Sequence, residues 1–124
     1  MQNGVPDRPL DPKAVRVASS KMLPESDERR MEGLLAGLCD PTRVKIILAL
    51  SENNTLAAGD LAHVIGRSRS ATSQHLKVLK EIGAVSSKRD GNIVRYTLAP
   101  DVNGEVIEHA VSAFERLREE SGAA

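Results

Sequence analysis

The stretch that decides the fold is residues 59–98, which read GDLAHVIGRSRSATSQHLKVLKEIGAVSSKRDGNIVRYTL. Apolar residues recur at helical spacing over residues 57–64 and again over 68–82, and Gly66 separates the two runs. Serine at position 68 or 70 is suited to cap the second run. Two short helices joined by a tight turn that contains glycine predict a helix-turn-helix.

After Gly83 the apolar period changes from helical to alternating. Apolar and polar residues alternate over 85–88 and over 93–98, as is typical of strands. Asp90-Gly91 between the two runs is a strong hairpin signal. We therefore expect a two-stranded wing directly after the helix-turn-helix.

Two further helices are expected before this stretch and one after it. Ser26 is suited to cap a helix that begins near Pro24, and Asp40-Pro41 has the residue types that open a second. A last amphipathic helix is expected over 102–119. The predicted fold is mainly α with a small β-hairpin, a winged helix-turn-helix in the order α-α-α-α-β-β-α.

The sequence also predicts where the domain ends. Residues 24–119 are expected to form the winged helix-turn-helix domain for DNA binding and dimerisation. Residues 1–23 lack apolar periodicity, and prolines 6, 9 and 12 are expected to interrupt any helix there, which predicts a disordered N-terminal arm. This arm is either passive or uses its basic residues to reach DNA or another subunit. Residues 120–124 are expected to be a disordered tail.

Composition limits the class of protein. The chain has 124 residues, of which 40% are hydrophobic and 27% charged, and these values are typical of one globular domain. Cys39 is the single cysteine, so no disulfide can form within one chain, and no apolar run approaches the roughly 18 residues that cross a membrane. We expect a cytoplasmic protein without a membrane partner.

Positive charge is concentrated in one part of an electrically neutral chain. Residues 67–95 contain seven basic and two acidic residues, a net charge of +5, which leaves −5 for the remainder. A local basic segment of this kind is either a nucleic-acid footprint or an ordinary solvated surface.

The second helix of the pair has the side chains that a recognition helix needs. Short polar residues occupy its first turns, and they allow close approach to base edges in a major groove. Gln74 suits adenine, Arg69 suits guanine or a phosphate, and Lys77 and Lys80 suit phosphates, whereas Arg95 is either a DNA contact or structural. The residues expected to contact double-stranded DNA are Ser68, Arg69, Ser70, Thr72, Ser73, Gln74, His75, Lys77, Lys88, Arg89, Asn92 and Arg95.

The last helix is unusually apolar for so small a domain. An apolar stripe along this helix needs another surface to cover it, so we predict a homodimer through the terminal helices. The residues expected at this interface are Val106, His109, Ala110, Ala113, Phe114 and Leu117.

The chain resembles the ArsR/SmtB family of metalloregulatory-type repressors over residues 28–117. The resemblance rests on LCDPTRVKIILAL at 38–50 and on the stretch 59–98, in which SATSQHLKVL is the most specific piece. It implies a dimeric transcriptional repressor that binds an inverted repeat.

The resemblance does not extend to the metal sites of the family. Two cysteines of one family site correspond to Ala57 and Gly59 here. A second site on the last helix, counted without gaps, corresponds to Pro100, Val102, Ala113 and Arg116. No metal or other cofactor is therefore expected at the standard positions, and the inducing signal is unknown.

Two other residues are weaker candidates for sensing. Cys39 lies near the positive end of the helix that Asp40 opens, so it is either a reactive thiol or a small residue packed between helices. His109 has Glu105 four residues before it, which suits either a metal or ordinary hydrogen bonds at an interface.

Two other functional classes compete with DNA binding. A winged helix can also serve as a protein-interaction module without sequence-specific DNA binding. An enzyme is not expected, because no nucleophile–base arrangement, phosphate-binding glycine loop or clustered acid pair is present in the sequence.

Overall fold

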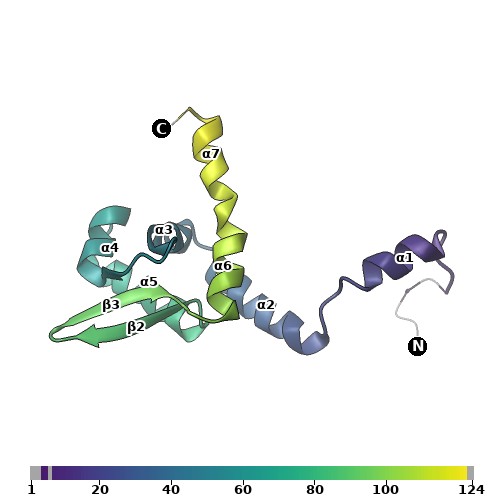
Figure 1. Cartoon of the computed structure of the whole chain (residues 1–124), viewed down its shortest axis with the longest axis horizontal. Coiled ribbons are helices and arrows are strands. Elements are labelled where there is room, and N and C mark those ends of the chain that lie inside the picture. Colours follow the sequence, from purple (N-terminus) through teal and green to yellow (C-terminus); the bar gives the residue numbers. More distant parts are fainter. Residues whose placement is uncertain (1–3, 6, 123–124) are drawn as a thin grey trace. The chain divides into compact units, whose positions relative to one another are not determined.

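A computed structural model of the chain describes residues 4–5 and 7–122 (Figure 1). The chain divides into two compact units at Arg30–Met31, and each is described by itself. The elements are α1 (Pro12–Ser19), α2 (Glu25–Gly37), α3 (Pro41–Leu50), β1 (Leu56–Ala57), α4 (Ala58–Ile65), α5 (Arg69–Glu81), β2 (Val85–Asp90), β3 (Ile93–Leu98), α6 (Val102–Ser112) and α7 (Phe114–Glu120). The winged helix-turn-helix is thus confirmed.

Helix α1 corrects the expectation that prolines exclude a helix before residue 24. Pro12 is the first residue of α1, where a missing N–H costs nothing, and the Asp11 side chain accepts a hydrogen bond from the Ala14 N–H at 3.0 Å. Residues 1–3 and 6 of the expected arm lie outside the described residues. At the other end, Glu120 belongs to α7 rather than to the expected tail, of which 123 and 124 also lie outside the described residues.

The core of the second unit is built from α3, α4, α5 and α6. Each contributes aliphatic side chains that are completely or almost completely buried. These are Ile46, Ile47 and Leu50 of α3, Leu61 of α4, Leu76 and Leu79 of α5, and Ile107 and Val111 of α6. Several apolar side chains of α2 and α4 are exposed instead: Met31, Leu35 and Val64 are 43%, 54% and 60% exposed.

Local capping fixes where these helices begin and end. Asp40 caps α3 as predicted, with its carboxylate accepting the Thr42 N–H at 2.7 Å. Gly66 ends α4 in the left-handed conformation, at φ 69°, which a residue with a Cβ rarely adopts. Ser26 does not cap α2, because it is the second residue of that helix.

The wing is part of a three-stranded antiparallel sheet in the order β1-β3-β2. Strand β1, which the sequence did not predict, pairs Leu56 with Tyr96. The pairing of Asp90 with Ile93 makes Gly91 and Asn92 the two loop residues, one position later than expected. Gly91 has φ 63°, as a tight hairpin of this length requires.

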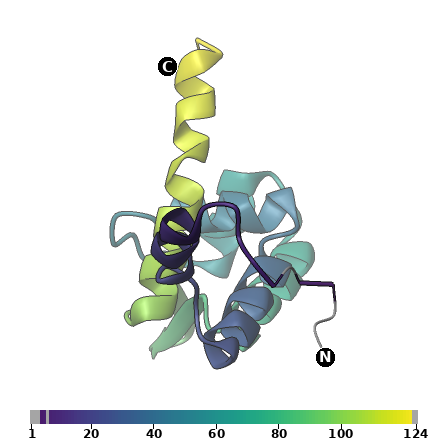
Figure 2. The ribbon, with the colours of Figure 1, turned by 90° about the vertical axis from the view of Figure 1, so that its right-hand side faces the viewer.

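The expected last helix is divided at Ala113 into α6 and α7. Helix α6 buries Gly104, Ile107 and Val111, whereas α7 buries no residue. In Figures 1 and 2, α7 extends beyond α6 and away from α3, the helix that packs against α6. The terminal helix is thus anchored in the core of its own domain at one end only.

Gly104 allows α6 to approach the chain that leaves the sheet. A Cβ at this position would overlap the backbone carbonyl of Ala99, which follows β3. Backbone cannot rotate aside as a flexible side chain can, so the contact requires glycine.

Replacing Gly104 by alanine should lower the free energy of unfolding by about 1–3 kcal/mol, because the added methyl group overpacks a rigid contact. The matched control is Gly33→Ala in α2, where a Cβ would meet nothing within 4 Å. That control should raise the free energy of unfolding by about 0.5–1 kcal/mol. Urea denaturation measures both changes, and equal effects would contradict the close approach.

The cap at Asp40 should make stability depend on pH. The Thr42 N–H donates to its carboxylate and holds the pKa of Asp40 below the ordinary 3.8, and the nearby charge of His75 acts in the same direction. A group with a lowered pKa in the folded state stabilises the fold above its unfolded pKa and loses this effect as the pH falls through the folded value. The stability advantage of the natural chain over Asp40→Ala should therefore be full at pH 7 and shrink below about pH 4. Chemical denaturation across this range measures it, and a constant difference would disprove the role of the charge.

Candidate nucleic-acid interface

The exposed side of α5 presents one polar stripe. Ser70, Ser73, Gln74 and Lys77 follow the spacing i, i+3, i+4, i+7, so they lie on one face, and all four are exposed. Leu76 and Leu79 lie on the opposite side, in the core. This is the arrangement expected of a helix that enters a groove with one face and packs with the other.

Two residues predicted to contact DNA have structural roles instead. Thr72 is completely buried, and its hydroxyl donates to the Ser68 carbonyl at 2.8 Å, so it cannot reach a base. Ser68 is the N-cap of α5, and its hydroxyl accepts the Ala71 N–H at 3.0 Å. Thr72 is therefore removed from the predicted interface. Ser68 remains exposed, but its hydroxyl oxygen already accepts the hydrogen bond from Ala71.

The two remaining α5 candidates differ in their surroundings. Arg69 is exposed at the first turn of the helix. His75 is half-buried and lies close enough to Asp40 for its charge to affect the pKa of that carboxyl group.

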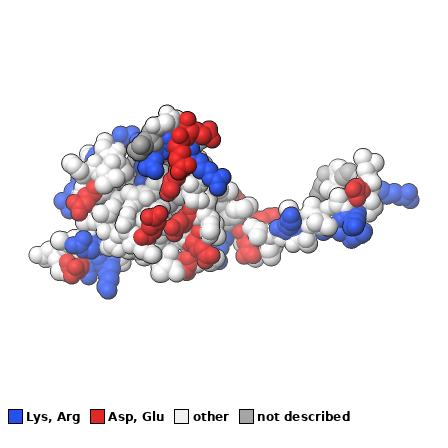
Figure 3. All heavy atoms as spheres, turned by 45° about the horizontal axis from the view of Figure 1, so that its top comes forward, with Lys and Arg blue, Asp and Glu red and all other residues white. Residues whose placement is uncertain are grey.

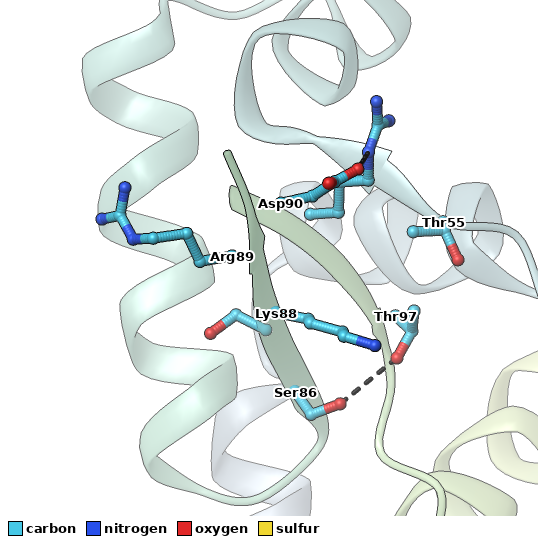
Figure 4. A pocket seen from close by; sticks show the side chains of 8 residues that line it. Thr55, Ser86, Lys88, Arg89, Asp90 and Thr97 are labelled. Atoms are coloured by element: carbon cyan, nitrogen blue, oxygen red, sulfur yellow. Dashed lines mark hydrogen bonds and ion pairs between the residues drawn. The ribbon is translucent and has the colours of Figure 1, made fainter. Parts of the chain in front are cut away.

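The alternation of strand β2 places its two basic residues on opposite faces of the sheet. Ser87 accepts a hydrogen bond from the Lys80 ammonium of α5 at 2.6 Å, so the face that carries Ser87 and Arg89 is the one next to α5. Lys88 lies on the other face, directly opposite Arg95. Figure 4 shows the Arg89 and Lys88 side chains leaving β2 in different directions.

The structure therefore divides the predicted wing contacts into two groups. Arg89 is exposed on the side of α5, and Asn92 is exposed in the loop of the hairpin. Lys88 and Arg95 share the outer face, where the Arg95 Nε atom lies 3.7 Å from the Asp90 carboxylate. The sequence does not predict the hydrogen bond between Lys80 and Ser87. It does show that Ser87 and Arg89 lie two residues apart on a strand and therefore point to the same face.

Charge on the surface is unevenly distributed. In Figure 3, basic side chains gather at the end of the wing, whereas acidic side chains gather over the centre of the same face.

The apolar residues predicted at a dimer interface are all exposed in the single chain. Val106, Phe114 and Leu117 are 47%, 46% and 59% exposed, and Ala110 and Ala113 are exposed beside them. His109 is exposed at the edge of this stripe. The buried side of α6 is a different one, formed by Ile107 and Val111.

The sensing candidates are separate from one another. Cys39 is exposed, with its Sγ atom 3.4 Å from the Leu35 carbonyl, so of its two alternative roles the one that packs it between helices is wrong. Among the residues that the structure describes, no three His, Cys, Asp or Glu side chains are grouped as metal ligands would be. Within the same described part of the chain, none of the helices has the length and apolar character that crossing a membrane requires.

Comparison with known proteins places this arrangement in a family. The family described as "Bacterial regulatory protein, arsR family" matches residues 40–87. The cadmium resistance transcriptional regulatory protein CadC of Listeria innocua is 39% identical over 82 residues, which cover 66% of this chain and 68% of CadC. The transcriptional regulator NmtR of Mycobacterium tuberculosis is 30% identical over 112 residues, which cover 90% of this chain and 82% of NmtR.

A solved structure agrees with these relatives. The transcriptional repressor BigR from Xylella fastidiosa superposes with a TM-score of 0.66 at 26% identity, over 75% of this chain and 91% of that one. The helix-turn-helix and wing described above are thus shared with a protein that represses transcription. The chain belongs to the ArsR family of bacterial regulatory proteins, and it is a DNA-binding transcriptional regulator and not an enzyme.

Proposed function

We propose that the protein is a homodimeric repressor that binds an inverted-repeat operator and releases it in response to a signal. The observation that carries this proposal is the polar stripe of α5, which is exposed opposite a completely buried apolar face. A surface that only contacts another protein has no need of short polar side chains with basic residues beside them.

Each group on this surface has a role in the proposed complex. Ser70, Ser73 and Gln74 lie at the floor of the major groove, where Gln74 pairs with adenine. Arg69 contacts guanine or a phosphate. Lys77 and Arg89 bind phosphates from the two sides of the groove, which sets the position of the helix without selecting sequence.

Dimerisation uses the exposed stripe of α6 and α7. Its apolar residues recur at helical spacing from Val106 to Leu117, so two copies related by a two-fold axis can cover each other. The two α5 helices then read half-sites about one turn of DNA apart. The lone exposed thiol of Cys39 is compatible with a reducing cytoplasm.

The signal acts by favouring one dimer geometry over another. A ligand that binds both geometries equally shifts nothing, so the inducer must distinguish two spacings of the α5 helices. CadC is named for cadmium resistance, but the family's thiolate positions hold Ala57 and Gly59 in this chain. We therefore propose a signal other than a metal bound to those thiolates.

Gln74→Ala and Lys77→Ala should have different effects on DNA binding. The first removes a base contact and should weaken binding to the operator by about 1–3 kcal/mol, with little effect on random DNA. The second removes a phosphate contact and should weaken binding to all sequences, with a salt slope smaller by about one. An operator for this measurement comes from selection of duplexes out of a random pool.

Fluorescence anisotropy at several salt concentrations separates the two effects. Lys45→Ala, at an exposed position of α3, is the matched control, because it removes one positive charge and leaves the stripe of α5 intact. If both alanine variants weaken specific and random binding alike, the assigned roles are wrong.

Phe114→Glu should convert the dimer to a monomer without unfolding the domain. Two phenylalanine side chains leave the interface, and the loss of their burial weakens association by about 100-fold. Light scattering after size exclusion measures the mass, and circular dichroism checks the fold. Val64→Glu, also an exposed apolar residue but on α4, is the matched control and should remain a dimer. A dimeric Phe114→Glu variant would refute the interface.

A further inference from the structure

The inner face of strand β2, which is turned toward α5, changes from buried to exposed along the strand. It carries Val85, Ser87 and Arg89 in alternation, of which the first is buried, the second half-buried and the third exposed. Leu98 and Tyr96, the cross-strand partners of Val85 and Ser87, pack against the core. Apolar packing thus holds the base of the wing, whereas the part that carries Arg89 extends beyond it.

One hydrogen bond joins α5 to the wing where this packing ends. The Lys80 ammonium donates to the Ser87 hydroxyl at 2.6 Å, across the turn that connects the helix to the strand. The turn itself is closed by backbone, since the Ala84 N–H donates to the Leu79 carbonyl at 2.9 Å. Within the part of the chain that the structure describes, no other hydrogen bond links a side chain of α5 to the wing. The direction of the outer wing relative to α5 therefore depends on this contact.

Lys80 continues the spacing of the polar stripe of α5 by one more turn. It follows Lys77 by three residues and Ser73 by seven, and it is exposed, so its position in the helix alone predicts another phosphate contact. The structure directs its ammonium group sideways to Ser87 instead. A side chain directed in this way connects the polar stripe to the wing and does not lengthen the stripe.

We propose that Lys80 is a positioning residue of the DNA-binding surface, which acts through Ser87 to hold Arg89 in place beside the polar stripe of α5. Arg89 lies two residues beyond Ser87, about 7 Å further along the same face of the strand, and leaves β2 in a different direction from Lys88 (Figure 4). A wing that is held at Ser87 loses less freedom when DNA binds, which favours the complex. This inference rests on the phosphate contact that the proposed function assigns to Arg89.

The first measurement tests the hold on the wing in the full chain without DNA. Backbone amide relaxation by NMR gives the order parameters of residues 88–92, and these should fall in Lys80→Ala and in Ser87→Ala. Ser87→Thr keeps the hydroxyl group and suits a strand, so it should retain the natural values. Ser86→Ala is the matched control, because it removes the neighbouring hydroxyl on the outer face. No fall in Lys80→Ala, or an equal fall in Ser86→Ala, would overturn the proposal.

The second measurement is the DNA affinity of the same variants by fluorescence anisotropy. Lys80→Ala and Ser87→Ala should each weaken binding about two- to tenfold, which corresponds to the usual net contribution of one hydrogen bond. The double variant should bind no more weakly than either single one, because both changes break the same contact. In the Arg89→Ala background, neither change should have a further effect, since the residue that they position is gone.

A direct contact between Lys80 and a phosphate predicts the opposite pattern. Lys80→Ala would then lower the salt slope by about one in the natural chain and again in the Arg89→Ala background, whereas Ser87→Ala would leave binding unchanged. That result would show that the proposal is wrong. If Arg89→Ala itself leaves DNA binding unchanged, the phosphate contact in the proposed function is wrong, and the order parameters of the free protein still decide whether Lys80 holds the wing.

Discussion

Burial of the apolar side of α5 is the constraint on which the rest of the structure depends. Leu76 and Leu79 are completely buried against the aliphatic residues of α3, α4 and α6. Once these two side chains point inward, the rotation of the helix is fixed, and Ser70, Ser73, Gln74 and Lys77 must point outward. In the proposed complex with DNA, the buried residues Leu76 and Leu79 thus decide which side chains of α5 face the bases.

In the wing, the alternation of side chains along a strand likewise decides which residues share a surface. Neighbouring residues of β2 face opposite sides, so the adjacent cations Lys88 and Arg89 have different environments. The hydrogen bond between Lys80 and Ser87 holds one side of the strand against α5, and Arg89 shares that side. A basic cluster that looks continuous in the sequence is therefore two surfaces in space.

Much of the fold follows from local signals in the sequence. The caps at Asp40 and Ser68 and the glycine after α4 are short-range features, and they place these helix ends correctly. Helix α1 begins with the same aspartate–proline signal at Asp11-Pro12, and prolines 6 and 9 do not interrupt it because they come before its first residue. Strand β1 has two residues that are held by pairing with distant β3, so nothing local marks it. Thr72 is polar, yet it is buried because its hydroxyl bonds to the preceding turn.

The glycine at position 104 limits how the protein can change shape. Because α6 touches the backbone of Ala99 directly, the helix and the sheet cannot slide past each other without a clash. The core residues Ile107 and Val111 hold the next turns in the same way, whereas α7 has no such attachment. In the proposed dimer, α6 is therefore fixed to the sheet and core of its own domain, so a small rotation of one α6 against the other would displace the two α5 helices by a larger distance.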